Sequence, residues 1–261
     1  MAENAGDGGR EAERPSVIRP TDADSLRLAK TLVRNARFGA ISVLEPETGH
    51  PFASRVLVGT DIDGVPVILA SMLTTHMKAI IADPRCALLL GEPGKGDPLA
   101  WPRITLLCAA ERIDRDGESD QRIRDRFLRR HPKAKLYAAF RDFSFFRLVP
   151  KRASLNGGFG RAYNILGGEL IIDSPFNHEL FSHEVYFIAE IEKLGCNTPD
   201  LLAKAYFKEK TGNWTISGID ADGVDLARRE TIHRLEFVKR VTDSNGLIAE
   251  YSKLLMELPK N

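Results

Sequence analysis

The chain has 261 residues, which is enough for one large domain or two small ones. Its 37 lysines and arginines against 36 aspartates and glutamates give a formal net charge of +1, which argues against a dedicated nucleic-acid binder. The hydrophobic fraction of 43% allows a full core, and no apolar run approaches the roughly 18 residues of a membrane span. No secretory signal is visible, so we expect a cytoplasmic protein without a nucleic-acid or membrane partner.

The cysteines exclude two further classes of protein. Cys86, Cys108 and Cys196 are widely spaced and form no CxxC motif. An odd number of scattered cysteines fits neither a disulfide framework nor a zinc ribbon. We therefore predict that the chain has no metal-binding cluster of its own.

The first 173 residues divide into a tail and a strand-rich segment. Residues 1–20 are rich in Gly, Ala and Glu, and we expect a disordered tail that ends where Thr21 caps a first helix. Further helical patterns occur at 76–82, 118–130 and 133–140. Runs with strand character occur at 38–44, 53–59, 65–71, 86–91, 103–110, 143–149 and 152–156. Because short turns join most of these runs, the pattern predicts an antiparallel barrel over residues 21–173.

The rest of the chain, residues 174–261, is predicted to be a second and smaller domain. Ser174 and Pro175 mark the boundary. Helical patterns at 178–193 and 199–209 precede three short strands, and a final helix covers 243–257. This order gives a small α-β-β-β-α domain, so the whole chain is predicted to be of class α+β.

One cluster of polar residues has the chemistry of an anion site. Arg55 lies in an apolar strand, where an unpaired cation is costly, so it needs an anionic partner. After the next strand come four more polar groups at the start of a helix: Ser71, Thr75, His76 and Lys78. Hydroxyls, an imidazole and two cations suit a phosphate dianion. The alternative is that Thr75 only caps the helix and that Arg55 pairs with Asp61 or Asp63.

Three stretches of the sequence resemble one known family. They are THMK at 75–78 with DPR at 83–85, GDPLAWPRIT at 96–105, and the run from FLRRHPK at 127–133 through FSFFRL at 143–148 to GGFGRA at 157–162. In combination these motifs resemble the pyridoxamine-5′-phosphate-oxidase-type FMN-binding split barrel, and more narrowly its haem-utilisation branch. The segment from about 185 to 255 is similar to the C-terminal domain of that branch. The glycine-rich run at 157–160 is not a dinucleotide fingerprint and is predicted to be a kinked strand.

The resemblance implies a six-stranded split barrel, a homodimer with the ligand cleft between its subunits, and an FMN-dependent oxidoreductase. The cofactor-binding residues that it implies are Arg55, Val56, Leu57, Ser71, Thr75, His76 and Lys78. Arg55 and Lys78 would hold the FMN phosphate, and the backbone of the Arg55 strand would meet the isoalloxazine edge. Met77 stands where the family has a phosphate-binding arginine, so one charge-assisted partner is missing. No residue presents itself as catalytic.

The haem-utilisation branch implies haem as the alternative ligand, in a haem-binding or haem-degrading protein without stable flavin. Haem iron needs an axial ligand, which is usually a histidine. The chain has six histidines: His50, His76, His131, His178, His183 and His233. His178 and His183 are spaced i and i+5 and do not share a helix face, so either could act only singly. The branch's His-x-Asn-x-x-His pattern is matched to residues 193–198, which lack both histidines.

A non-catalytic regulatory module is the third interpretation. Residues 122–135 hold seven lysines or arginines against one acid, Asp125. This basic segment would be either a cationic surface for a partner or a solvated helical face whose arginine stems cover the barrel.

Overall fold

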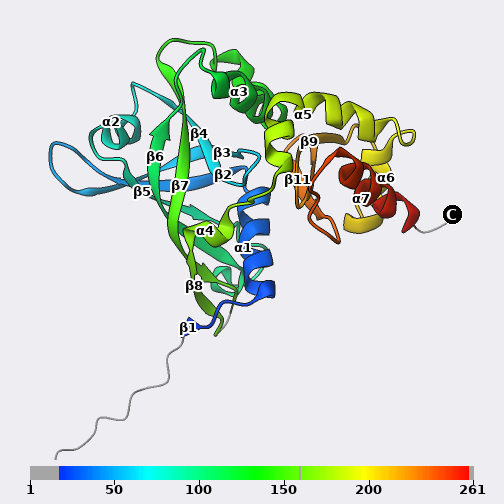
Figure 1. Cartoon of the computed structure of the whole chain (residues 1–261). Helices are drawn as coiled ribbons and strands as arrows, with labels where there is room; N and C mark the ends of the chain where they lie inside the picture. Colours follow the sequence, from blue (N-terminus) through cyan, green and yellow to red (C-terminus); the bar gives the residue numbers. More distant parts are fainter. Residues whose placement is uncertain (1–17, 159, 259–261) are drawn as a thin grey trace, which may run out of the picture.

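The structure, a computed structural model, describes residues 18–158 and 160–258 (Figure 1). The predicted tail at 1–20 therefore lies almost wholly outside the described residues. Within the described part of that range, β1 (Ile18–Arg19) pairs in parallel with β8 (Ala162–Leu166), so these two residues do not belong to a disordered tail.

Helix α1 (Ala23–Asn35) begins with a different cap from the one predicted. The Asp22 carboxylate accepts a hydrogen bond from the Ser25 N–H at 2.7 Å, and the Ser25 hydroxyl accepts one from the Asp22 N–H at 2.9 Å. Thr21 instead donates its hydroxyl to the Asn164 carbonyl at 3.1 Å, which ties the start of α1 to β8.

Six antiparallel strands close into a barrel: β2 (Phe38–Leu44), β3 (Pro51–Thr60), β4 (Pro66–Ser71), β5 (Arg85–Leu90), β6 (Arg103–Arg112) and β7 (Phe143–Asn156). Their order is β7-β4-β3-β2-β5-β6, and the pairing of β6 with β7 closes the ring. The predicted antiparallel six-stranded barrel is confirmed, and with it the class α+β.

The barrel interior follows the two-residue period of its strands. In β2, Ile41 and Val43 are buried, while Phe38 and Ala40 face outward and are half-buried. The interior merges with the apolar side of α2 (Thr75–Ala82), whose Met77 is fully buried. Methionine at this position therefore serves the core.

Two strand predictions near the end of the barrel are wrong. Residues 143–156 form one strand and not two, because a bulge opposite Leu107 and Cys108 accommodates Pro150 without breaking the ladder. Gly157, Gly158 and Gly160 lie in a turn between the strands and not in a kinked strand, with Gly158 at φ 97° and Gly160 at φ 69°; residue 159 lies outside the described residues. That turn leads into β8, which the pattern analysis missed.

Two more helical segments lie between β6 and β7, and two short ones flank the barrel. The helix predicted at 118–130 is α3 (Glu118–Arg130), whereas the one predicted at 133–140 is only the 3-10 helix η2 (Pro132–Leu136). The 3-10 helix η1 (Pro98–Ala100) precedes β6, and α4 (Gly167–Leu170) follows β8. No helix in the described part of the chain combines the length and apolar character needed to cross a bilayer.

The C-terminal part packs three helices and three strands of its own around a second core. Its elements are α5 (Phe176–Glu192), α6 (Thr198–Phe207), β9 (Thr215–Asp220), β10 (Gly223–Arg228), β11 (Thr231–Glu236) and α7 (Ser244–Met256). The sheet order is β11-β10-β9, and helices α5, α6 and α7 pack beside it (Figure 1). Asp243 caps α7 as predicted, accepting from the Gly246 N–H at 2.8 Å. Ile62 and Ile172 of the preceding segment join this core, so the two parts share buried surface.

Candidate functional site

Arg55 lies on the outside of the barrel. Its guanidinium is exposed and sits 5.3 Å from the centre of the Phe38 ring on the neighbouring strand. Leu57 shares this outer face, whereas Val56 points into the core. The alternative that Arg55 pairs with Asp61 or Asp63 is wrong, because both carboxylates pair with arginines elsewhere.

The other residues predicted to hold a phosphate lie at the end of β4 and the start of α2. Ser71 donates its hydroxyl to the Asp142 carboxylate at 2.7 Å. The buried His76 ring lies 2.9 Å from the Ser54 hydroxyl, and burial lowers the pKa of His76. The helix cap is Thr74, which accepts from the Met77 N–H at 3.4 Å, so the alternative of a Thr75 cap is wrong.

Lys78 is exposed in the first turn of α2, one residue beyond Met77. No described contact joins Lys78 to Arg55, although the Ser54–His76 contact ties their elements together. The phosphate site therefore stays a prediction, with its hydroxyl and imidazole groups already bonded within the chain.

The basic segment 122–135 is not solvated throughout, because two of its arginines are buried. Arg126 and Arg130 of α3 are almost fully buried and face the C-terminal part of the chain. Arg126 pairs with Glu184 and donates to the Ile219 carbonyl at 2.9 Å. Arg130 lies 3.6 Å from the Asp225 carboxylate. The helix thus uses its cations to join the two parts of the molecule.

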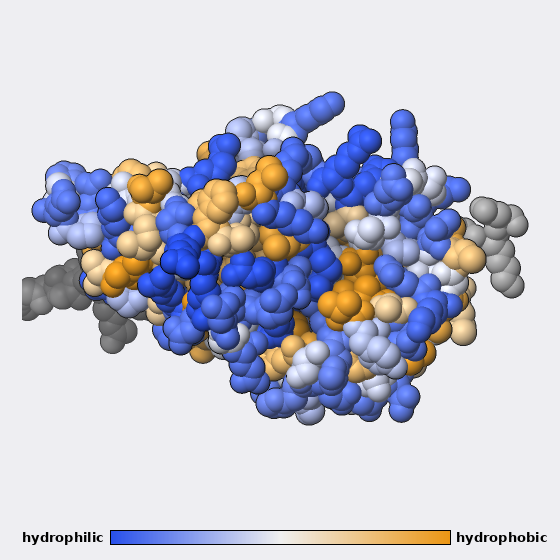
Figure 2. Space-filling view, turned by 90° about the horizontal axis from the view of Figure 1, so that it is seen from above, coloured by the Kyte–Doolittle hydropathy of each residue, from blue (hydrophilic) through white to orange (hydrophobic). Residues whose placement is uncertain are grey.

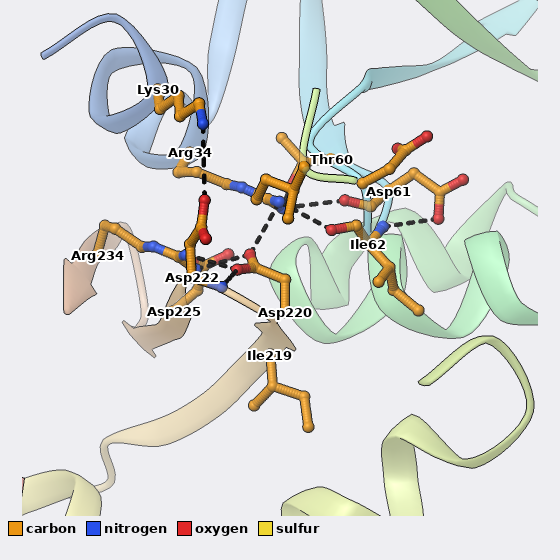
Figure 3. A network of polar contacts seen from close by, with 12 residues as sticks. Lys30, Arg34, Thr60, Asp61, Ile62, Ile219, Asp220, Asp222, Asp225 and Arg234 are labelled. Atoms are coloured by element: carbon orange, nitrogen blue, oxygen red, sulfur yellow. Dashed lines mark hydrogen bonds and ion pairs between the residues drawn. The ribbon is translucent and has the colours of Figure 1, made fainter. Parts of the chain in front are cut away.

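A second set of buried charges continues this junction from α1 (Figure 3). Arg34 donates to the Thr60 hydroxyl and to the carbonyls of Asp61 and Ile62 at 2.9 Å, and pairs with Asp220 at 2.8 Å. Asp220 also accepts two hydrogen bonds from Arg234, at 2.6 and 2.8 Å. We call Arg34, Arg126, Arg130, Glu184, Asp220, Asp225 and Arg234 the junction cluster.

A groove of about 730 Å³ opens between α3 and α5, beside the junction cluster. Its α3 and β7 wall carries Arg122, Arg129 and Arg147. Arg122 pairs with Asp61, and its guanidinium lies 4.4 Å from the centre of the Phe181 ring. Its α5 wall carries Phe181, Val185 and Tyr186 together with the polar residues Ser182, His183 and Glu184. A volume of this size suits a small organic ligand or cofactor.

Helix α5 is broken where it meets the groove. His183 has φ −132° and ψ 19°, which is not helical, while its neighbours continue the helix. The next residue, Glu184, is drawn into the junction by Arg126, Arg129 and the Ile219 N–H. His183 is exposed on the groove, and its imidazole has no hydrogen bond to the described residues 18–158 and 160–258. The break has no signal in the sequence, since no Gly or Pro marks it.

The remaining histidines have other surroundings. His131 is buried and donates to the Val58 carbonyl at 2.8 Å, and burial lowers its pKa to about 4. His131 precedes Pro132, which is typical of an exposed turn, but the structure buries it. His233 stacks on Phe207 with ring centres 4.3 Å apart and contacts Glu209 at 3.1 Å. His50 and His178 are exposed.

The stretch matched to the histidine pattern of the haem-utilisation branch does not open a helix pair in this structure. Residues 193–197 form the connection between α5 and α6, not the opening of the helix pair. The pair opens at Phe176, so His178 and His183, which have the spacing i and i+5 of the expected pattern, lie in its first turns. Of these two histidines, His183 lines the groove and His178 does not.

Figure 2 shows the molecule from above, which is the side that carries α3 and α5 at the top of Figure 1. Patches of apolar side chains interrupt a mostly hydrophilic surface over both parts of the chain. The exposed apolar residues of the α5 wall, Val185 and Tyr186, are about three-fifths exposed. Such surface is available to an apolar ligand.

Comparison with known proteins places the chain in a family. The profile described as "CREG, beta-barrel" matches residues 20–172, more than half of the chain. The chloroplastic heme oxygenase HOZ of Arabidopsis thaliana is 29% identical over 202 residues, which cover 74% of this chain but only 57% of the plant protein. A solved structure of a protein of unknown function from Agrobacterium tumefaciens is 30% identical, with TM-score 0.78, over 92% of this chain and 100% of that one. A heme binding protein from Mycobacterium smegmatis shares the fold at 24% identity and TM-score 0.53, over 94% of this chain and 100% of that one. The chain therefore belongs to the CREG β-barrel family, within the pyridoxamine-5′-phosphate-oxidase-like split-barrel superfamily.

Proposed function

We propose that this chain binds haem in the α3–α5 groove, with His183 as the axial ligand of the iron. One observation carries the proposal: an exposed imidazole stands on a groove of suitable volume at a break in α5. Histidine is the usual axial ligand of haem iron in proteins. The name of the plant relative, a heme oxygenase, supports haem as the ligand class.

The lining of the groove has groups suited to the iron, the macrocycle and the propionates of haem. Phe181, Val185 and Tyr186 provide apolar and aromatic surface for the macrocycle. Of the groove's arginines, Arg129 has the most exposed side chain, at 25%. A guanidinium has five N–H donors, so Arg129 can bind a propionate while it keeps its pair with Glu184. Bound haem would supply the iron, and the residues of this chain would bind and orient it.

Replacing His183 by alanine is expected to weaken hemin binding by about tenfold or more, because even a supporting contact of a metal ligand has that effect. The measurement is a hemin titration of the full chain, followed by the Soret band. His50→Ala is the matched control, since His50 is an exposed histidine in the β2–β3 hairpin. Equal titrations of the His183→Ala and His50→Ala variants contradict the assignment of His183.

Haem breakdown is the second candidate activity, and the name of the plant relative favours it. The measurement is loss of the Soret band when hemin-loaded protein is given a reductant in air. A band that stays unchanged while free hemin is degraded identifies binding without breakdown.

The flavin interpretation has less support than haem. Ser71 and His76, which would hold the FMN phosphate, are bonded to Asp142 and Ser54. A carboxylate beside Ser71 also repels a phosphate dianion. An FMN titration of the Arg55→Ala and Lys78→Ala double variant tests the FMN phosphate site separately from the haem site, because neither residue lines the α3–α5 groove.

We further propose that the chain forms a homodimer through the outer face of β2, β5 and β6. Leu44 and Leu89 on this face are 44% and 43% exposed, and a hollow of about 500 Å³ beside them is lined by Ala87 and Leu107. An uncovered apolar sheet face of this kind is typical of a protein interface.

Replacing Leu89 by glutamate is expected to dissociate the dimer, because each interface would then bury two unpaired carboxylates. Light scattering after gel filtration would report the 29.0 kDa of a single chain for this variant and twice that mass for the wild type. Leu136→Glu is the control, since Leu136 is exposed on η2 and not on this face. A wild-type mass of 29.0 kDa contradicts the proposal.

A further inference from the structure

We propose that a second pocket, between the barrel and the β10–β11 hairpin, binds a small organic dianion. The pocket has a volume of about 580 Å³ and is separate from the α3–α5 groove, with which it shares no lining residue. Its polar lining consists of Arg37, His131, Lys133, Arg229 and Glu230. The proposal is independent of haem binding.

The pocket has more positive than negative charge. Three of its side chains are cationic at neutral pH, and Glu230 is its one carboxylate among the lining residues. Glu230 pairs with Arg37 and lies 3.6 Å from Lys133, so it must balance both. The Arg37 guanidinium beside Glu230 lowers the pKa of that carboxyl, which keeps it ionised. The single carboxylate of Glu230 is therefore shared by two cations, and Arg229 adds a third.

Arg229 is the unbalanced cation of the pocket. It is exposed at the tip of the β10–β11 hairpin and makes no hydrogen bond or ion pair with residues 18–158 or 160–258. Its backbone has φ 52°, the left-handed conformation that side-chain-bearing residues disfavour. The fold thus holds an arginine without a partner at the mouth of the pocket.

A second donor inside the pocket also lacks an acceptor. The Nε atom of Arg37 is buried and has no hydrogen bond within the described part of the chain. A buried donor without an acceptor is unfavourable, so the pair with Glu230 does not satisfy every donor of Arg37. Arg37 and Arg229, which line the pocket from the two parts of the chain, therefore both have hydrogen-bonding capacity that the described residues do not use.

The walls between these cations are mainly uncharged. Leu57, Pro132 and Ala134 provide apolar surface, and the buried His131 ring is bonded to the Val58 carbonyl. A ligand with a short apolar body and negative charge at two positions fits this lining. Planar guanidinium groups bind carboxylates and phosphates in bidentate fashion, so the ligand class is a dicarboxylate or a phosphate monoester.

The test is isothermal titration calorimetry of the full chain at constant ionic strength, with glutarate and inorganic phosphate as separate probes. Saturable binding of either probe is expected; binding of glutarate alone identifies a dicarboxylate site, and of phosphate alone a phosphate site. Arg229→Asn is expected to weaken binding about tenfold, since asparagine tolerates the left-handed backbone and removes only the cation. Lys208→Asn is the matched control, because Lys208 is an exposed cation at φ 57° outside the pocket.

A second variant acts in the opposite direction. Glu230→Gln removes the carboxylate that competes for Arg37 and Lys133, so it is expected to tighten binding severalfold. Absence of saturable binding by both probes, equal losses in the Arg229→Asn and Lys208→Asn variants, or loss of binding in the Glu230→Gln variant would each overturn the proposal.

Discussion

Replacing Asp220 by asparagine is expected to lower the free energy of unfolding by about 3–5 kcal/mol, the usual cost of breaking a buried ion pair by removing one partner. Asp220 is fully buried and pairs with Arg34 of α1 and Arg234 of β11. Asparagine keeps the shape but leaves the buried Arg34 guanidinium without its anion, and it removes one of the two carboxylates of Arg234, which keeps Asp225 at 3.2 Å. Because Arg34 belongs to the barrel and Arg234 to the C-terminal sheet, the loss is shared by both parts. Urea unfolding at neutral pH measures it.

The same residue predicts a dependence of stability on pH. Burial alone raises the pKa of Asp220, but Arg234 and Arg34 outweigh it and lower that pKa to about 2. A carboxyl whose pKa is lower in the folded than in the unfolded state stabilises the fold above pH 4, and this stability is lost as the pH falls toward 2. The wild type should therefore lose this contribution between pH 4 and pH 2, and the Asp220→Asn variant should have a shallower dependence there.

Asp222→Asn is the matched control for both measurements. Asp222 lies two residues away and is partly exposed, with ion pairs to Arg240 at 2.6 Å and Lys30 at 3.6 Å. Partly exposed pairs of this kind contribute about 1 kcal/mol or less. Equal losses of stability in the two variants, or no loss for Asp220→Asn, would contradict a special role for the buried pair.

The barrel could be predicted from the sequence because its signals are local. Strands such as 38–44 are short runs rich in apolar residues, and turn residues separate them, so each strand is identified by its own residues. The capping aspartate before α7 is local in the same sense. Where the prediction was wrong, a contact distant in sequence decided the outcome. Pro150 remains within the single strand β7 because a bulge is accommodated in the pairing of β7 with β6.

The junction cluster could not be predicted, since its partners are far apart in the sequence. Arg126 lies on a helix whose pattern is typical of a solvated basic face, and its carboxylate partner Glu184 is 58 residues away. The sequence contains both charges but nothing that specifies their pairing. The partner of Arg55 could not be predicted for the same reason. Asp61 and Asp63 are near Arg55 in the sequence, yet they pair with Arg147 at 2.9 and 2.6 Å.

The candidate groove depends on both a local sequence signal and a contact between residues far apart in the sequence. Histidines spaced i and i+5 were visible in the sequence, but a regular helix would have turned them to different faces. The break at His183 changes that geometry, and it arises where Glu184 is held by α3. The groove is therefore a product of the contact between the two parts of the chain, and its ligand class depends on that contact.

Replacing Glu184 by glutamine is expected to impair stability and hemin binding together, because Glu184 connects the junction cluster to His183. Its carboxylate accepts from Arg126, from Arg129 and from the Ile219 N–H at 3.0 Å. Arg126 is buried, so a neutral partner leaves its charge poorly compensated, and a loss of about 3 kcal/mol in the free energy of unfolding is expected. The adjoining His183 would lose the contact that holds it out of the regular helix.

Two comparisons separate a positioning role of Glu184 from a general loss of folding. Under conditions in which circular dichroism shows every variant folded, Glu184→Gln should change the Soret maximum and weaken hemin binding, whereas Glu179→Gln, an exposed residue of the same helix, should change neither. His183→Ala should weaken hemin binding at nearly wild-type stability, since its exposed imidazole has no hydrogen bond to the rest of the described chain. If the folded Glu184→Gln variant binds hemin with the wild-type spectrum and affinity, then the break in α5 does not depend on the junction, and the contact between the two parts serves stability alone.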